Sequence, residues 1–152
     1  MTALDCAEGD WIAVPLRSDG YAVGIIARMK EMQIFGYFFG PKRDAVPELD
    51  ELSGLRPDDA VLVGAFGGLG LKKGKWAVLG RFDNWDRADW AFPPLVRYEE
   101  LTGQTYRVTY DDNDPGKVLH QEVVEPGAAE QGPRDGLMGH GFVELKLTKL
   151  LD

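Results

Sequence analysis

The sequence predicts a mainly β fold, built as a curved antiparallel sheet or a small barrel with one or two short helices. The first observation is a series of short β-rich runs separated by turn residues, with 19 Gly and 9 Pro among 152 residues. The second is the aromatic content, since four Trp, five Tyr and seven Phe suit a core packed on a pleated surface. The third is that helical spacing is rare along the chain.

The first two strands are predicted over Trp11–Leu16 and Tyr21–Met29. Asp19-Gly20 between them is a strong hairpin signal, because glycine adopts the positive φ that tight turns require. Gly24 interrupts the second strand, and a glycine at such a position predicts a bulge or a sharp bend.

A third strand is predicted over Met32–Phe39, and we expect it to end at Gly40-Pro41. Its residues alternate between two faces that are both largely apolar. A strand of this kind is covered on each side, so we expect it to lie in the centre of the sheet.

The rest of the chain alternates short elements with turns. Val46–Leu55 is predicted to hold a short helix or a turn, whereas Phe142–Leu151 fits both strand alternation and helical spacing. The turn residues Asp111–Gly116 predict a second hairpin between Thr105–Tyr110 and Lys117–Val124. Further strands are expected over Ala60–Phe66, Trp76–Phe82 and Leu95–Tyr98, and connections over 67–75, 83–92 and 126–139, the last of them a mobile surface loop.

Length, charge and cysteine content limit the class of protein. With no internal repeat and no boundary signal, residues 1–152 are predicted to form a single domain. The single Cys6 excludes an internal disulfide and, without a secretion signal or a long apolar run, favours a cytoplasmic protein. The net charge of −8 repels phosphate and anionic lipid, so we expect neither nucleic acid nor a membrane as partner.

No set of residues fills the roles of a catalytic, metal or cofactor site. The sequence brings no base beside Cys6, and His120 and His140 are too few for zinc, which takes three or four protein ligands. The glycine-rich run over 64–75 lacks the hydroxyl residue of a phosphate loop, and 111–114 lacks the spacing of a calcium loop. We therefore expect no enzyme, no metal and no cofactor.

The segment 81–94 interleaves aromatic and acidic side chains, and two interpretations of it stay open. Its tryptophans either anchor a long loop onto the core or form a recognition surface, where exposed Trp often dominates the binding energy. A second acidic stretch lies between residues 48 and 59. The candidate partner-binding residues are Asp83, Trp85, Asp86, Asp89, Trp90, Glu48, Asp50, Glu51, Asp58 and Asp59.

Three N-terminal motifs, GDWIAVPL at 9–16, GYAVG at 20–24 and IFGYFFG at 34–40, resemble the start of the immunity-protein-26 family. The strand at Trp76–Arg81, the Trp90–Pro93 element and the Tyr110–Asp114 turn are similar in order and type, so the likeness covers most of Asp10–Lys149. These are bacterial proteins of polymorphic toxin systems. The resemblance implies a mainly β protein that binds and neutralises a cognate toxin domain inside the producing cell, and it supplies no catalytic residue or toxin-contact motif.

Two functions are therefore carried forward. In the first, the chain is an immunity protein whose acidity speeds encounter with a basic toxin, and which would occupy the phosphate groove if that toxin is a nuclease. In the second, the chain is an SH3-like peptide- or ligand-binding module, on a small SH3-like barrel, whose aromatic groove uses Tyr37, Trp85 and Trp90.

Overall fold

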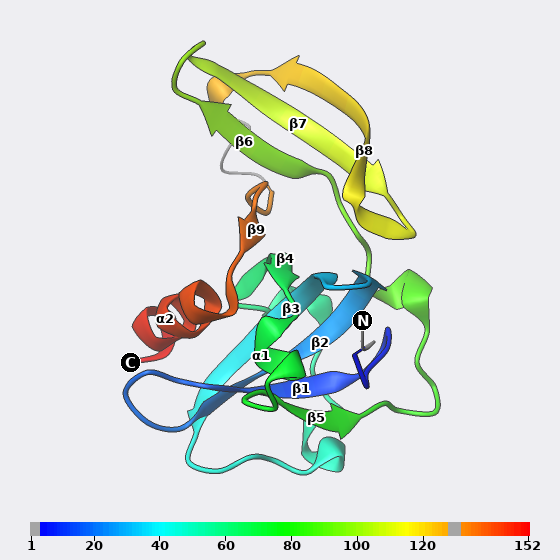
Figure 1. Cartoon of the computed structure of the whole chain (residues 1–152), viewed down its shortest axis with the longest axis vertical. Helices are drawn as coiled ribbons and strands as arrows, with labels where there is room; N and C mark the ends of the chain where they lie inside the picture. The colour runs from blue at the N-terminus through cyan, green and yellow to red at the C-terminus, as the bar shows by residue number, and fades with distance from the viewer. Residues whose placement is uncertain (1–3, 128–131) are drawn as a thin grey trace.

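The computed structural model describes residues 4–127 and 132–152, and these residues form two separate β-sheets with two α-helices (Figure 1). The prediction of a mainly β chain with one or two short helices is confirmed. Over the described residues the strand orders are β5-β1-β2-β3-β4-β9 and β6-β7-β8, so neither sheet closes and the barrel alternative was wrong. Among the same residues, no helix combines the length and the apolar character that crossing a membrane requires.

The elements follow one another along the chain with short connections. The larger sheet contains β1 (Trp11–Pro15), β2 (Tyr21–Lys30), β3 (Gln33–Arg43), β4 (Leu62–Gly67), β5 (Ala77–Gly80) and β9 (Leu137–Met138). The smaller sheet contains β6 (Leu95–Glu99), β7 (Gln104–Asp111) and β8 (Asp114–Val124). The helices are α1 (Leu69–Lys72) and α2 (His140–Leu151), with 3₁₀ turns η1 (Leu49–Leu52), η2 (Pro57–Asp59) and η3 (Arg87–Asp89).

The strand β3 lies in the centre of the larger sheet, between β2 and β4, as its two apolar faces predicted. Ile34 and Phe38 point into one hydrophobic core, which α2 and Trp76 cover. Phe35 and Phe39 point into the other, which η1 and the loop before β6 cover. The sheet is therefore sandwiched between two cores that share no residue.

The first hairpin is present as predicted, with Gly20 at φ 77° and the Leu16 amide donating to the Gly20 carbonyl. The bulge expected at Gly24 was wrong, because Gly24 pairs regularly with Phe38 on β3. The glycine is needed for a different reason. A Cβ at this position would lie 2.7 Å from the Phe38 ring, so only glycine allows the ring to pack against the strand.

Contacts distant in sequence correct two other expectations and decide one that the sequence left open. The strand β3 continues past Pro41 to Arg43. Pro41 lies where the register of β3 shifts against β2, so the N–H group that proline lacks is not needed for a hydrogen bond between the strands. The connection over 67–75 contains α1, which wraps Gly70 against the buried indole of Trp76. The ambiguous C-terminal segment is the helix α2, whose residues Val143 and Leu147 are fully buried.

The smaller sheet meets the larger one at its β7–β8 hairpin end, where β8 contacts β2 and β3 (Figure 1). A stack of three rings continues across this junction. Phe92 lies 4.3 Å from the Phe35 ring of β3 and 5.9 Å from the Tyr110 ring of β7, between ring centroids.

The segment expected to be a mobile loop, 126–139, falls partly outside the described residues, which omit 128–131. Its second half includes β9, which pairs in parallel with β4. The nearly buried carboxylate of Asp135 accepts hydrogen bonds from Arg97 of β6 and the Tyr110 hydroxyl of β7. Mobility of this segment and a single domain over 1–152 stay predictions.

Candidate functional site

The structure brings the two acidic stretches of the sequence to one pocket of about 290 Å³. One wall comes from residues 52–58, at the end of η1 and the start of η2, and the other from residues 82–90, around η3. The strands β1 and β2 form its floor through Trp11 and Ile25. Of the candidate partner-binding residues, Asp58, Trp85, Asp86, Asp89 and Trp90 line this pocket.

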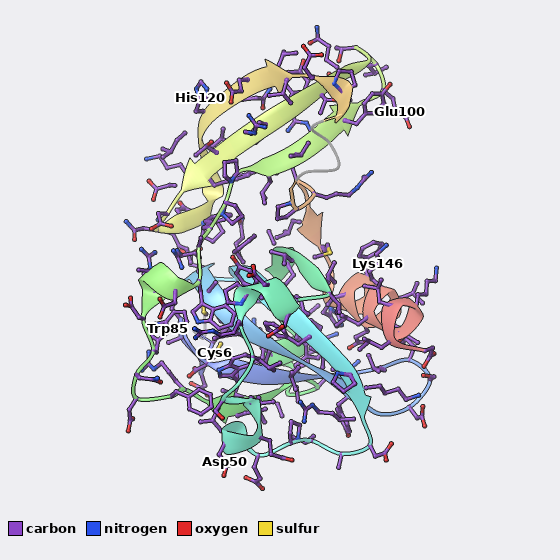
Figure 2. The ribbon with its side chains drawn as sticks, turned by 180° about the vertical axis from the view of Figure 1, so that it is seen from behind. Cys6, Asp50, Trp85, Glu100, His120 and Lys146 are labelled. Carbon is purple, nitrogen blue, oxygen red and sulfur yellow. The ribbon has the colours of Figure 1, made fainter. Side chains whose placement is uncertain are left out.

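The two tryptophans of the loop have different environments. Trp90 is only 8% exposed, and its ring meets those of Trp11, Tyr37 and Phe39 edge to face at centroid distances of 5.4–6.1 Å. Trp85 is only partly buried and stacks against Trp90 at 6.5 Å, with 24° between the ring planes. Trp90 therefore anchors the loop on the core, Trp85 (labelled in Figure 2) keeps part of its ring uncovered, and the recognition surface stays a prediction.

Trp85 is held over Gly9 of the N-terminal segment. Gly9 has φ 93°, and a Cβ there would lie 2.8 Å from the Trp85 indole, so this position requires glycine both for its backbone and for space. Trp85 also lines a second hollow, together with Asp83 and Arg81. The partly buried Trp85 thus lines both hollows.

The eight candidate carboxylates are all exposed, but they differ in what they bind. Glu51, Asp59 and Asp86 accept hydrogen bonds from backbone amides of their own 3₁₀ turns, which fixes those turns locally. In the parts of the chain that the structure describes, Asp58, Asp83 and Asp89 make no side-chain hydrogen bond or ion pair. We call Asp58, Asp83, Asp86 and Asp89 around Trp85 the acidic site. Glu48, Asp50, Glu51 and Asp59 lie on the adjoining turns and do not line the pocket.

Arg87, which lies between Asp86 and Asp89 in the sequence, has its partners outside the pocket, whereas Arg56 lines the pocket itself. Arg87 of η3 donates to Glu8 at 2.7 Å and to Asp112 at 2.8 Å, and also to the Asp112 carbonyl. The hydrogen bond to Glu8, followed by the nearby carboxylate charges, raises the pKa of Arg87, so its charge is fixed and matched within the protein. It therefore does not neutralise the carboxylates that line the pocket.

A buried arginine, which sequence reasoning missed, binds both the β7–β8 hairpin and the loop that carries Trp90. Arg28 of β2 is 4% exposed and donates to Asp112 at 2.8 Å and to the Trp90 carbonyl at 3.0 Å. The chain Arg28–Asp112–Arg87–Glu8 joins β2, the β7–β8 hairpin, η3 and the N-terminal segment. A charged residue inside a predicted buried strand was the signal available, since such a residue needs a partner.

The aromatic groove of the peptide-binding alternative is not formed. Tyr37 and Trp90 are buried and pack on each other, and the Tyr37 hydroxyl donates to the Ala91 carbonyl oxygen. A groove that binds a peptide needs exposed ring faces, and of Tyr37, Trp85 and Trp90 only Trp85 is partly exposed. No observation therefore favours that function.

Several groups considered for chemistry have structural environments. Burial, followed by the nearby Asp10 and Asp5, raises the pKa of the Cys6 thiol to about 11, so it is protonated at neutral pH and a poor nucleophile. His120 is exposed on β8, 3.8 Å from Glu122. Among the described residues no group of three His, Cys, Asp or Glu side chains is placed to hold a metal ion.

The model of a protein family described as Immunity protein 26 matches residues 7–107 of the chain. The matched residues include both walls of the acidic site and end within β7. The match is therefore shorter than the resemblance seen in the sequence, which reaches Lys149. No curated protein and no solved structure matches the chain.

Proposed function

The chain belongs to the Immunity protein 26 family, and from this we propose that it binds and neutralises one cognate toxin domain in the cell that produces both. The membership supports an immunity function, which implies a toxin as partner in general. It is also in keeping with a protein that acts by binding rather than by catalysis. The identity of the toxin and the contact surface are the finer parts of the proposal.

We propose that the acidic site is the contact surface. Its support is the convergence of two acidic stretches, about 25 residues apart in the sequence, around one pocket with a partly exposed indole. Trp85 supplies a rigid aromatic contact of the kind that dominates binding energy. The exposed carboxylates around it supply a negative field, which raises the association rate with a basic partner above about 10⁵–10⁶ M⁻¹s⁻¹.

The same chemistry favours a basic toxin domain as partner. A nuclease has a cationic groove for phosphate, and the exposed carboxylates of Asp58, Asp83 and Asp89 would bind there in place of phosphate groups. Such binding would block substrate access without any chemical step by the immunity protein. A cytoplasmic location is part of this proposal, because the toxin must be met where it is made.

The experiment uses the toxin domain encoded by the reading frame next to this gene. The unaltered chain is expected to rescue cells that express this domain. Rescue is measured as cell survival, and the affinity for the toxin domain is measured by titration calorimetry. The double variant Asp83→Lys, Asp89→Lys is expected to lose rescue and to bind at least about 100-fold more weakly, since both carboxylates change sign. The matched control, Asp44→Lys with Glu100→Lys, makes the same change in net charge at exposed positions outside the pocket.

The outcomes separate the two levels of the proposal. Loss of rescue in the first double variant alone supports the acidic site. Full rescue by both double variants would place the contact on another face while the immunity function stands. Failure of the unaltered chain to bind and protect would contradict the neutralisation of that toxin.

A further inference from the structure

The wall of the acidic site that carries Trp85 has one polar tether to the rest of the described chain. Among residues 82–89, Arg87 of η3 is the only one whose side chain forms a hydrogen bond or ion pair with a described residue outside this segment. The segment is anchored separately at its end, where the ring of Trp90 is buried in the core. Arg87 is therefore the polar link between this wall and its surroundings.

Arg87 binds two other parts of the protein at once. Its Nε donates to the Glu8 carboxylate at 2.7 Å. Its terminal nitrogens donate to the tip of the β7–β8 hairpin, which reaches the larger sheet (Figure 1). There they bind the Asp112 carboxylate at 2.8 Å, the Asp112 carbonyl, and the Asn113 side-chain oxygen at 3.0 Å. A planar guanidinium bound on several sides has a fixed direction, so these contacts hold η3 in one orientation.

The partners of Arg87 also belong to the surroundings of the Trp85 ring. Glu8 immediately precedes Gly9, over which the Trp85 indole lies. The hairpin tip is bound in turn by Arg28, which also donates to the carbonyl of Trp90, and the Trp90 ring stacks on Trp85. The two surfaces against which Trp85 packs are therefore connected through one network of hydrogen bonds.

We propose that Arg87 is a positioning residue of the acidic site, which holds the Trp85 wall in the geometry that a basic toxin domain recognises. The identity of the partner rests on the proposed function, whereas the position of Trp85 is a property of the free chain. The hairpin tip at 112–113 lies beyond residues 7–107, which match the family model. The site thus depends on the smaller sheet, although none of the residues described for that sheet lines the pocket.

Charge alone predicts the opposite effect of removing Arg87. Arg87→Gln takes a positive charge from between Asp86 and Asp89, which makes the local field more negative and favours a basic partner. Loss of position predicts weaker binding instead, because ordering an aromatic contact at the moment of binding costs free energy. The sign of the change in affinity therefore separates a positioning role from a purely electrostatic one.

The first measurement needs no toxin. Of the four tryptophans only Trp85 is partly exposed, so quenching of tryptophan fluorescence by acrylamide reports how well this ring is covered. Quenching is expected to rise in Arg87→Gln and to stay unchanged when the same substitution is made in a Trp85→Phe chain. The matched control is Arg107→Gln, which removes a cation and its 3.5 Å pair with Glu122 on the smaller sheet and should not change quenching.

The second measurement is the affinity for the toxin domain encoded next to this gene, by titration calorimetry. Arg87→Gln is expected to bind at least about tenfold more weakly, as for the loss of one well-placed aromatic contact. Arg107→Gln has the same net charge and should bind no more weakly than the unaltered chain. Arg87→Lys should not restore the affinity, because lysine keeps the charge but lacks the fork that reaches both partners.

A milder variant serves if circular dichroism shows that Arg87→Gln does not fold. Asn113→Ala removes one acceptor of Arg87 and leaves both of its ion pairs in place. Its changes in quenching and affinity should be smaller and in the same direction. The matched control is Gln121→Ala, which removes one amide acceptor of Arg97 on the smaller sheet and should change neither quantity.

The two measurements fail separately. Quenching that does not rise in Arg87→Gln or Asn113→Ala overturns the positioning role, whether or not the toxin binds. Increased quenching with unchanged or tighter binding overturns the role of this position in recognition. If the unaltered chain does not bind the toxin domain and quenching still rises, the proposed function fails while the positioning of Trp85 by Arg87 stands.

Discussion

The ion pair between Arg28 and Asp112 offers the sharpest test of how the two sheets are joined. Arg28 is 4% exposed in its side chain and Asp112 is 56% exposed, with 2.8 Å between Nε and Oδ1. Asp112→Ala leaves the guanidinium buried with only its hydrogen bonds to the Ala27 and Trp90 carbonyls, and it also removes the carboxylate that pairs with the partly exposed Arg87. Removing one partner of a fully buried pair costs about 3–5 kcal/mol, and an exposed pair contributes at most about 1 kcal/mol.

Because one partner is buried and the other is half exposed, we expect Asp112→Ala to lower the free energy of unfolding by about 2 kcal/mol. For a chain of this length the melting temperature should fall by about 4–8 °C. Urea unfolding followed by circular dichroism gives the free energy, and a thermal scan gives the melting temperature. The control is Lys30→Gln, which removes the 3.4 Å pair of the 57% exposed Lys30 with Asp114 and should cost less than about 0.5 kcal/mol.

A second substitution tests the cause. In Arg28→Met, Asp112→Ala the stranded cation is gone, so the double variant should be more stable than the sum of the two single changes predicts. The reasoning is refuted if Asp112→Ala costs no more than Lys30→Gln, or if the two single changes simply add.

Two further predictions concern aromatic side chains. Trp90→Ala should lower the free energy of unfolding by about 3–5 kcal/mol, as expected for a buried Trp, whereas Trp85→Ala should cost less stability but weaken toxin binding. Urea unfolding measures the stability of each variant, and calorimetry measures its binding. Equal losses of stability would contradict the assignment of Trp90 alone to the core. Burial, followed by the hydrogen bond to Asp135, raises the pKa of Tyr110 to about 12. An unfolded tyrosine titrates near pH ~10, so between these two values the folded chain keeps a proton that the unfolded chain loses. Stability should therefore fall as pH rises through this window, and it should fall less in Tyr110→Phe. Equal pH slopes of the urea midpoint in the two proteins would count against this prediction.

Much of the fold was predictable because its signals are local. Alternation of side chains, the Asp19-Gly20 turn and the two apolar faces of β3 depend on residues that are near one another in sequence, and these predictions were confirmed. Gly24 illustrates the limit of such reasoning. Its position in a strand was correct, but its cause is the Phe38 ring on the neighbouring strand, which sequence spacing does not reveal.

The sequence by itself determined a mainly β chain with a central apolar strand, two acidic stretches and no recognisable catalytic set. Only the tertiary structure decided that Trp90 is buried while Trp85 reaches the surface, and that Asp58 shares a pocket with Asp86 and Asp89. The physical reason is that burial and proximity depend on which elements pack together. Here the packing is fixed by contacts such as Arg28–Asp112, between residues 84 apart in the sequence.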